Sequence, residues 1–366
     1  MSTDTTLNDR IRGAVLGSAW GDAWGRPTEF WSFEQIEQAD PAPSDPLVVS
    51  DDTQMCLATN TALTGLIASD EGRRALLALP AGQGWDLVRE AFAHRYIAWR
   101  SDPDNDRAPG RACLAATGKL ELLAAAGGAR SWREGALGND SKGCGTTMRA
   151  PWAGLLGLPE PVTAAVSFAQ SQITHDHPMS WVAAAVVALL TQHCLALDET
   201  ARLRDFGLVG AAERAIEVVR PLAGLGSPAE RAGVVAACDE LAAHLARVRS
   251  LWDEFAADRG DPCLFFGQGW VADEALVTAT AVTQRAIDAG DPADAVRRLV
   301  HTGGDSDSMA ILGGAFVGAA WGFRELWAGL PVEGHFEPRY ERELAEAVVS
   351  IEAARAALQN ATPPGA

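Results

Sequence analysis

Two acidic clusters lie near opposite ends of the chain, each at the start of a predicted helix. The first is Ser50-Asp51-Asp52-Thr53 and the second is Asp305-Ser306-Asp307-Ser308. Adjacent carboxylates repel each other and are costly to bury unless a cation or a donor compensates them. Dense carboxylate and hydroxyl oxygens are the ligands that hard divalent cations use. If the fold brings the clusters together, they would make a two-metal hydrolytic site.

Helix capping is the alternative interpretation of each cluster. Ser, Asp and Thr are favoured at helix N-caps, and acids suit the positive end of the helix dipole. An N-cap needs only one side-chain oxygen, whereas each cluster offers several. The second cluster also follows Gly303-Gly304, a turn that permits unusual backbone angles. The excess of oxygens in both clusters favours metal binding.

Two further segments carry groups that could contact a ligand. In the glycine-rich loop 141–149, successive backbone N–H groups and threonine hydroxyls could hold a phosphate, although the lysine precedes the glycines and the loop is not a P-loop. His175 lies in the sequence Thr174-His175-Asp176-His177-Pro178. It could cap the next helix, bind metal together with His177, or stack on or hydrogen-bond to a ligand. Taken alone, Asp22 and Glu29 are interpreted as surface or capping acids.

The elements that must position these residues are predicted to be helices. Alternating strand patterns are almost absent, and glycine and proline interrupt helical periods instead. Loops are expected at 27–49, 101–110 and 138–147. Helices are expected at about 8–26, 53–69, 84–99, 111–126, 148–157, 160–172, 178–195, 209–219, 229–247, 270–288, 291–300, 307–327 and 339–358. We predict one compact all-α domain over 1–366, with its core at about 8–358 and a disordered tail at 359–366.

Glycines recur at every fourth position of the first predicted helix and place small residues along one face, where another helix can approach closely. They are Gly13, Gly17, Gly21 and Gly25. The helix after the second acidic cluster carries a similar set: Gly313, Gly314, Gly318 and Gly322. Trp20, Trp24 and Trp31 are expected to pack in the core.

Composition limits the partners. The net charge of −18 argues against binding nucleic acid or an anionic membrane through the general surface. The N-terminus lacks the features of a signal peptide, and the apolar stretches are expected to be too short or too interrupted to span a bilayer. The six cysteines are scattered. We expect reduced, buried thiols in a cytoplasmic protein.

These motifs, in this order, resemble the ADP-ribosylglycohydrolase family. The matching segments are Gly13-Ala-Val-Leu-Gly17 leading to Gly21-Asp22-x-x-Gly25, Ser50-Asp51-Asp52-Thr53, Ser141-Lys-Gly-Cys-Gly-x-x-Met148-Arg149, Thr174-His175, and Gly303-Gly304-Asp305-x-Asp307-Ser308. Gly269-Trp270-x-x-x-Glu274 also fits. The resemblance covers about 10–325 and implies an all-α orthogonal helical fold with two Mg²⁺ or Mn²⁺ ions in a cleft.

The resemblance also implies roles for individual residues. The implied metal ligands are Ser50, Asp51, Asp52, Asp305, Asp307 and Ser308. The catalytic candidates are Asp51, Asp52, Asp305 and Glu29, the last on a loop near the site. The implied contacts to ADP-ribose are Glu29, Gly143, Cys144, Gly145, Thr146, His175, Gly303 and Gly304. Ser50 and Ser308 stand where threonine is common in the family, and both keep a hydroxyl.

The expected activity is metal-dependent hydrolysis of the bond between ADP-ribose and a modified acceptor. Two metals would hold the ribose diol and activate water, and a ligating carboxylate would accept the water's proton. Either Asp52 or Asp305 is expected to bridge the metals, while Glu29 acts as an acid/base or as a gate. The acceptor stays open: it is arginine, serine or another amino acid of a protein, a nucleic acid, or a small molecule. The alternatives are an ADP-ribose-binding or catalytically silent relative on the same fold, and a nucleoside-type metal hydrolase, whose fold would be α/β.

Overall fold

Two glycine-bearing helices pack against each other in antiparallel directions at the centre of the fold. In the computed structural model, which describes residues 6–126, 131–198 and 200–360, they are α1 (Leu7–Gly25) and α15 (Ser306–Trp321). A β-carbon on Gly17 would lie 2.9 Å from the Gly314 oxygen, and one on Gly21 would lie 2.5 Å from the Ala310 oxygen. The backbones therefore touch along the glycine face, which confirms the predicted reason for the four-residue spacing.

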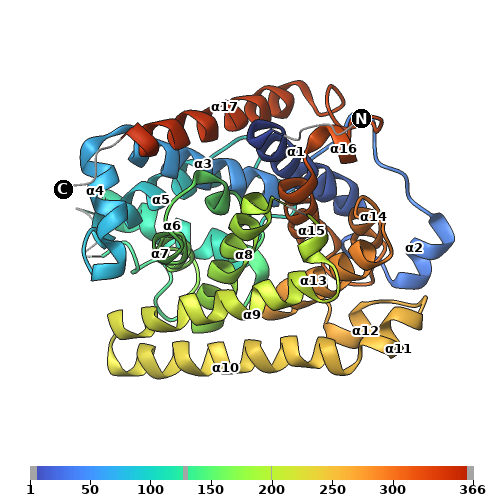
Figure 1. Cartoon of the computed structure of the whole chain (residues 1–366). Coiled ribbons are helices and arrows are strands. Elements are labelled where there is room, and N and C mark those ends of the chain that lie inside the picture. Colours follow the sequence, from blue (N-terminus) through green and yellow to red (C-terminus); the bar gives the residue numbers. More distant parts are fainter. Residues whose placement is uncertain (1–5, 127–130, 199, 361–366) are drawn as a thin grey trace.

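The other helices surround this pair. They are α2 (Phe33–Ala39), α3 (Asp51–Ala68), α4 (Asp70–Ala78), α5 (Trp85–Arg100), α6 (Arg111–Ala125), α7 (Glu160–Ser171), α8 (Pro178–Ala196), α9 (Gly207–Val219), α10 (Pro228–Ser250), α11 (Trp252–Ala257), α12 (Cys263–Phe266), α13 (Ala272–Asp288), α14 (Asp294–Val300), α16 (Phe323–Leu326) and α17 (Pro338–Asn360). In Figure 1, α17 and α10 lie on opposite sides of the molecule, with α8 and α15 between them.

Strands are absent from the described parts of the chain, where pairing is limited to two isolated bridges, Leu47 with Phe336 and Gly143 with Val271. The prediction of an all-α fold is confirmed. The nucleoside-hydrolase alternative depended on an α/β fold, and this structure gives it no support.

The core is a continuous cluster of apolar side chains built around α8 and α15. Every residue of α15 is buried, because its small and apolar side chains meet other helices on all sides. By length and composition α8 could cross a membrane, so the prediction that every apolar stretch is too short or too interrupted was wrong for 178–196. Its window is 83% buried within the protein, which is the pattern of a core helix.

Several local predictions need correction. The segment 148–157 was predicted as an α-helix but forms a short 3-10 helix, Pro151–Leu156. Gly157, with a φ of 74°, ends this helix. The supposed loop 27–49 contains α2, which begins with a capping box formed by Ser32 and Gln35. Helices α4, α11 and α12 were missed, and each is short. Gly322, with a φ of 86°, divides the predicted helix 307–327 into α15 and α16.

Two other predictions hold only in part. Residues 359 and 360 belong to α17 and are not part of a disordered tail, while 361–366 lie outside the described residues. Trp20 and Trp24 are buried as predicted, but Trp31 is 39% exposed. The first two lie on α1 beneath other helices, whereas Trp31 follows the exposed turn after the 3-10 helix Arg26–Thr28.

Candidate active site

The fold brings the two acidic clusters into contact. The N-terminus of α3 carries Asp51 and Asp52, and the N-terminus of α15 carries Asp307 and Ser308, with Asp305 at its N-cap. The Ser308 hydroxyl donates to Asp52 Oδ2 at 2.8 Å across this junction. The antiparallel register of α1 and α15 sets the position, because a β-carbon on Gly25 would lie 2.7 Å from the Asp307 Cα.

Asp22 of α1 holds the first cluster in place. Its carboxylate accepts the Ser50 N–H at 3.0 Å and the Thr53 N–H at 3.1 Å, and so caps α3 from outside that helix. Of the two interpretations of Asp22 taken alone, a surface acid or a capping acid, the first was wrong, because the residue is fully buried, and the second holds. The signal in the sequence is its place between Gly21 and Gly25, because side chains beside a close helix contact are buried.

The capping interpretation holds for one cluster only. Ser50 is the N-cap of α3, and its hydroxyl accepts the Asp52 N–H at 3.1 Å. Asp305 stands at the N-cap position of α15 without a side-chain capping bond. Capping therefore uses Ser50 and leaves most carboxylate oxygens of the two clusters free for other partners.

The clustered carboxylates are buried without a cation. Asp22, Asp51, Asp52, Asp305 and Asp307 are each at most 5% exposed, and within the described residues none forms an ion pair with Lys, Arg or His. Burial is the largest cause that raises the pKa of each one, to about 6 for Asp22 and well above the usual range for Asp51, Asp52 and Asp305. The charge of Asp307 raises the other four further. Such a site attracts positive charge.

A cleft of about 650 Å³ opens over the clusters. This volume falls within the usual range for small-molecule sites. Its lining comprises Glu29, Phe30, Asp51, Asp52, Ala108, Pro109, Gly110, Arg111, Ala112, Cys113, Ser141, Gly143, Cys144, Gly145, Met148, His175, Trp270, Asp305 and Ser308. Ser50 and Asp307 lie outside the lining, behind the carboxylates that reach the cleft.

Glu29 faces the same group of acids from the turn after α1. One of its carboxylate oxygens lies within 4.8 Å of oxygens of Asp305 and Asp307. Partial burial raises the pKa of Glu29 to about 10, and the charges of Asp307 and Asp305 add to that effect. Glu29 therefore belongs to the acidic group in space, which its position in the sequence alone does not show.

The glycine-rich loop places Cys144 against the second cluster. The Cys144 thiol donates to Asp305 Oδ2 at 2.8 Å, and burial raises the pKa of this thiol well above its usual value. The Cys144 N–H donates to the Trp270 carbonyl at 3.2 Å, which fixes the loop beside the start of α13. Gly143 and Gly145 line the cleft on either side of the thiol.

His175 is buried behind the glycines of this loop. A β-carbon on Gly143 would lie 3.2 Å from its Nε2, so a larger residue at 143 would press on the ring. Arg149 donates to Thr174 Oγ1 at 2.8 Å, and this hydroxyl lies 2.9 Å from His175 Nδ1. Thr174 thus occupies Nδ1 of the ring and leaves Nε2 beside Gly143. Burial, with the charge of Arg149, lowers the pKa of His175 to about 3.

Three predicted ligand contacts lie outside the cleft lining. The Thr146 hydroxyl is buried and donates to the Ser180 carbonyl at 2.8 Å. The Gly303 N–H donates to Asp261 Oδ2 at 3.2 Å. A β-carbon on Gly304 would lie 2.0 Å from the Gln268 oxygen, so this glycine admits the neighbouring backbone of the protein.

The sequence interpretation missed one wall and part of the rim of the cleft. The wall is the N-terminus of α6, where Gly110 donates to Asp51 Oδ2 at 3.2 Å and Arg111 supplies a cation. The helix itself was predicted at 111–126, but no local signal indicated that its N-terminus would line the site. At the rim, the rings of Phe30 and Trp270 stack with centroids 5.6 Å apart, although the residues are 72% and 37% exposed. No spacing in the sequence indicates that pairing.

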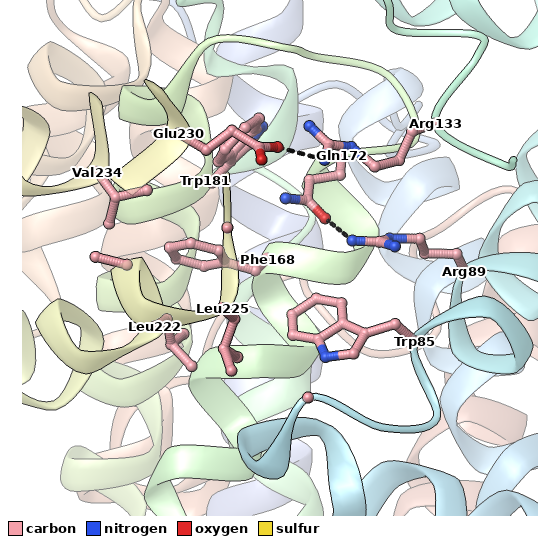
Figure 2. Close-up of a pocket in the computed structure, with 13 residues that line it drawn as sticks. Trp85, Arg89, Arg133, Phe168, Gln172, Trp181, Leu222, Leu225, Glu230 and Val234 are labelled. Carbon is pink, nitrogen blue, oxygen red and sulfur yellow. Dashed lines mark hydrogen bonds and ion pairs between the residues drawn. The ribbon is translucent and has the colours of Figure 1, made fainter. Parts of the chain in front are cut away.

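A second hollow, of about 290 Å³, lies away from the acids (Figure 2). Arg89 and Arg133 enter it together with the rings of Trp85, Phe168 and Trp181. Its link to the first site is structural, because the Trp181 indole N–H donates to the His175 carbonyl at 2.8 Å. The acidic clusters and His175 therefore make the first cleft the candidate active site.

Two comparisons with known proteins bear on the fold and the family of the chain. The chain has the fold of a solved structure described as an "ADP-ribosylglycohydrolase-related protein complex", with a TM-score of 0.59 and 18% sequence identity over 95% of this chain and 99% of that chain. At that identity the likeness shows the fold alone. The family described as ADP-ribosylglycohydrolase matches residues 3–358, nearly the whole sequence. The resemblance read from five short motifs is thus confirmed, and the chain belongs to the ADP-ribosylglycohydrolase family.

Proposed function

We propose that this protein is a metal-dependent hydrolase that releases ADP-ribose from a modified acceptor. One observation carries the proposal: Asp51, Asp52 and Asp305 reach the floor of a ligand-sized cleft as buried carboxylates that pair with no Lys, Arg or His of the described residues. Family membership supports a glycosidic bond as the target.

The residues present fit a pair of divalent cations. Ser50, Asp51, Asp52, Asp305, Asp307 and Ser308 offer only oxygen donors, which Mg²⁺ and Mn²⁺ prefer. Burial, with the charge of Asp307, raises the pKa of Asp52 and of Asp305, and a bound cation would offset both effects. When bound, two such ions would supply charge to hold the ribose hydroxyls and lower the pKa of water.

The protein's own groups then provide proton transfer. Water adds to the anomeric carbon of the ribose, and the bond from that carbon to the acceptor atom breaks. The floor carboxylate, Asp52 or Asp305, accepts the proton of the attacking water. The leaving group takes up a proton as it departs, and Glu29, on the rim side of the acids, is placed to donate it. Atoms and charge balance as hydrolysis to ADP-ribose and free acceptor.

The remaining walls suit the diphosphate of ADP-ribose. The N-terminus of α6 has no side-chain cap and lines the cleft, and a helix N-terminus attracts phosphate. Arg111 adds a positive charge there. Beside α6, the backbone of Gly145 and the Nε2 side of His175 offer further polar groups to a ligand. A strongly acidic protein can therefore hold an anionic ligand through local groups.

The test is a panel of ADP-ribosylated substrates with defined linkages, including arginine and serine, incubated with Mg²⁺, with Mn²⁺ and with EDTA. Release of ADP-ribose is measured by chromatography. We expect turnover of at least one linkage with metal and none in EDTA. Full activity of the EDTA-treated enzyme would refute metal dependence. Tight binding of ADP-ribose without turnover of any linkage would instead favour the binding-protein alternative.

A further inference from the structure

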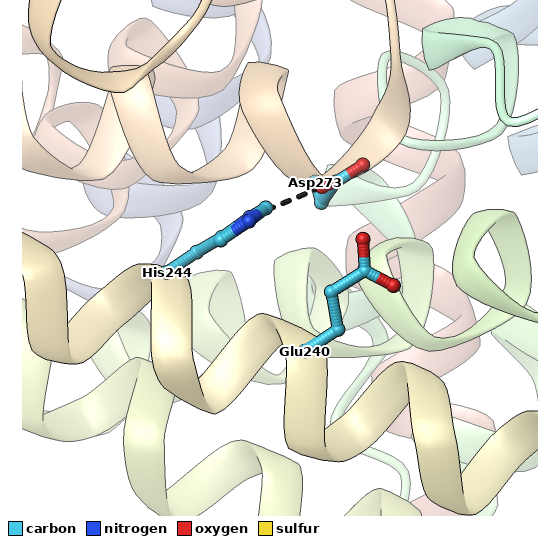
Figure 3. Close-up of side chains that lie close together, drawn as sticks. All are labelled: Glu240, His244 and Asp273. Atoms are coloured by element: carbon cyan, nitrogen blue, oxygen red, sulfur yellow. Dashed lines mark ion pairs between the residues drawn. The ribbon is translucent and has the colours of Figure 1, made fainter.

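Three metal-ligating side chains meet on the outer side of the wall that carries Lys142 and Gly143. Glu240 and His244 are four residues apart on α10 and so share a face, and Asp273 lies in the first turn of α13. Figure 3 shows the two α10 side chains directed toward Asp273. His244 Nδ1 is 3.1 Å from Asp273 Oδ2, and one ligand atom from each residue lies within 4.8 Å of the others.

Asp273 brings an unsatisfied oxygen to this cluster. Its side chain is 3% exposed, and its Oδ1 is buried without a hydrogen-bond partner. A carboxylate oxygen in that position is costly, because it has lost water and gained no donor. Its nearest cation, the Lys142 ammonium, is 3.7 Å away, which is beyond hydrogen-bond distance.

Lys142 partly neutralises the cluster. Its Nζ donates to Glu240 Oε1 at 3.0 Å, and its side chain is 30% exposed. The cluster thus attracts cations, and a lysine on a flexible stem is a partner that can move aside.

We propose that Glu240, His244 and Asp273 form a second divalent-cation site, separate from the acids in the cleft and suited to Zn²⁺ or another cation that accepts an imidazole ligand. One nitrogen and two carboxylate oxygens are donors that Zn²⁺ uses, with positions left for water. Mg²⁺ prefers oxygen ligands and holds its water strongly, so a site that includes the His244 imidazole favours Zn²⁺ over Mg²⁺. Asp273 is fixed in the wall, while the more exposed Glu240 and His244 can rotate to close around an ion.

Binding of an ion at this second site would affect the cleft through backbone hydrogen bonds. The Ala272 N–H donates to the Lys142 carbonyl at 2.7 Å, and Gly143 pairs with Val271 in an isolated bridge. The inner side of the same strip lines the cleft through Gly143, Cys144 and Trp270. An ion held by α10 and Asp273 would therefore brace the loop that contacts Asp305.

The experiment is calorimetric titration of the full chain with Zn²⁺ in excess Mg²⁺, which occupies the oxygen-only cluster. We expect one Zn²⁺ equivalent to bind. His244→Gln and Asp273→Asn should weaken it by at least the roughly 10- to 100-fold that loss of a supporting partner costs at other metal sites. Lys142→Met should tighten binding, because it removes the competing ammonium. His335→Gln is the matched control, since its imidazole faces only Asp45 at 3.7 Å.

The outcomes separate clearly. If Asp273→Asn fails to fold by circular dichroism, His244→Gln and Glu240→Gln, on the more exposed helix α10, carry the same comparison. Equal Zn²⁺ binding by His244→Gln and the parent would overturn the proposal, since the ion would then lie elsewhere. Absence of Zn²⁺ binding in both the parent and Lys142→Met would also overturn it and leave a salt-bridge network.

Discussion

Gly314→Ala tests whether close contact between α1 and α15 sets the position of the acids. A β-carbon at 314 would lie 2.2 Å from the Gly17 oxygen, on backbone that cannot rotate away. Alanine gains about 1 kcal/mol of helix propensity over glycine. Overpacking typically costs about 1–3 kcal/mol, and a clash between two helix backbones belongs at the upper end of that range. We therefore expect a net loss of about 2 kcal/mol in the free energy of unfolding.

Gly65→Ala is the matched control, because Gly65 also lies within a helix and its β-carbon would meet nothing within 4 Å. It should stabilise the protein by about 0.5–1 kcal/mol. Urea unfolding followed by circular dichroism at equal denaturant slope compares the two variants. Opposite signs are expected, with activity lost only in Gly314→Ala because Asp22 and Asp307 move apart. If both variants gain stability equally, the close packing described for these helices is wrong.

Three further predictions concern the charged site. In metal-free protein the carboxyl pKa values are raised, so above about pH 4 the folded state keeps protons that the unfolded chain has released. Protonation therefore stabilises the folded state at acid pH. This stabilisation is lost as the pH rises through the folded-state pKa, which is about 6 for Asp22. For Asp22 alone it is on the order of 3 kcal/mol. Thermal unfolding in EDTA and in Mg²⁺ should show a larger metal benefit at pH 8 than at pH 5, and the reverse order would contradict the sign. Asp305→Asn and Asp52→Asn should each abolish turnover and keep the helical circular dichroism spectrum. Each should also raise the unfolding midpoint of the metal-free protein, because it relieves repulsion between carboxylates. A lowered midpoint would show that the protein already compensates the charge of the replaced carboxylate. Because burial lowers the pKa of His175 to about 3, its ring should stay neutral from pH 5 to 8 in NMR titrations, and a midpoint near 6.5 would refute its burial.

The sequence predicted the parts of the fold that depend on short-range pattern. Long helices such as α1 and α8 were predicted from long apolar runs bounded by prolines, Pro27 after α1 and Pro178 at the start of α8. The spacing from Gly13 to Gly25 identified the helix face that packs. Short helices such as α2 and α4 were missed, because a few residues carry too little periodic signal to outweigh neighbouring breakers.

The site was predictable where motif and chemistry coincide. Asp52 and Asp305 were identified because each lies in a cluster of acids in the sequence, and clustered carboxylates need a cation or a donor when they are buried. The α6 wall and the Phe30–Trp270 contact did not, since they depend on how distant segments fold together. Gly304 lies outside the cleft lining, and its small size admits the Gln268 backbone, a contact that no local pattern distinguishes from room for a ligand.

The pairing of α1 with α15 also has a consequence for biosynthesis. Ser308 and Asp52 are 256 positions apart, so their contact closes a loop that spans most of the chain. Contacts at such separation slow folding, because chain entropy is lost before the contacts form. While the ribosome is still translating the middle of the chain, α1 has no partner for its glycine face, and Asp22, Asp51 and Asp52 remain in water. The acids are forced together only after α15 emerges, which makes late synthesis the stage when a divalent cation can first contribute to folding.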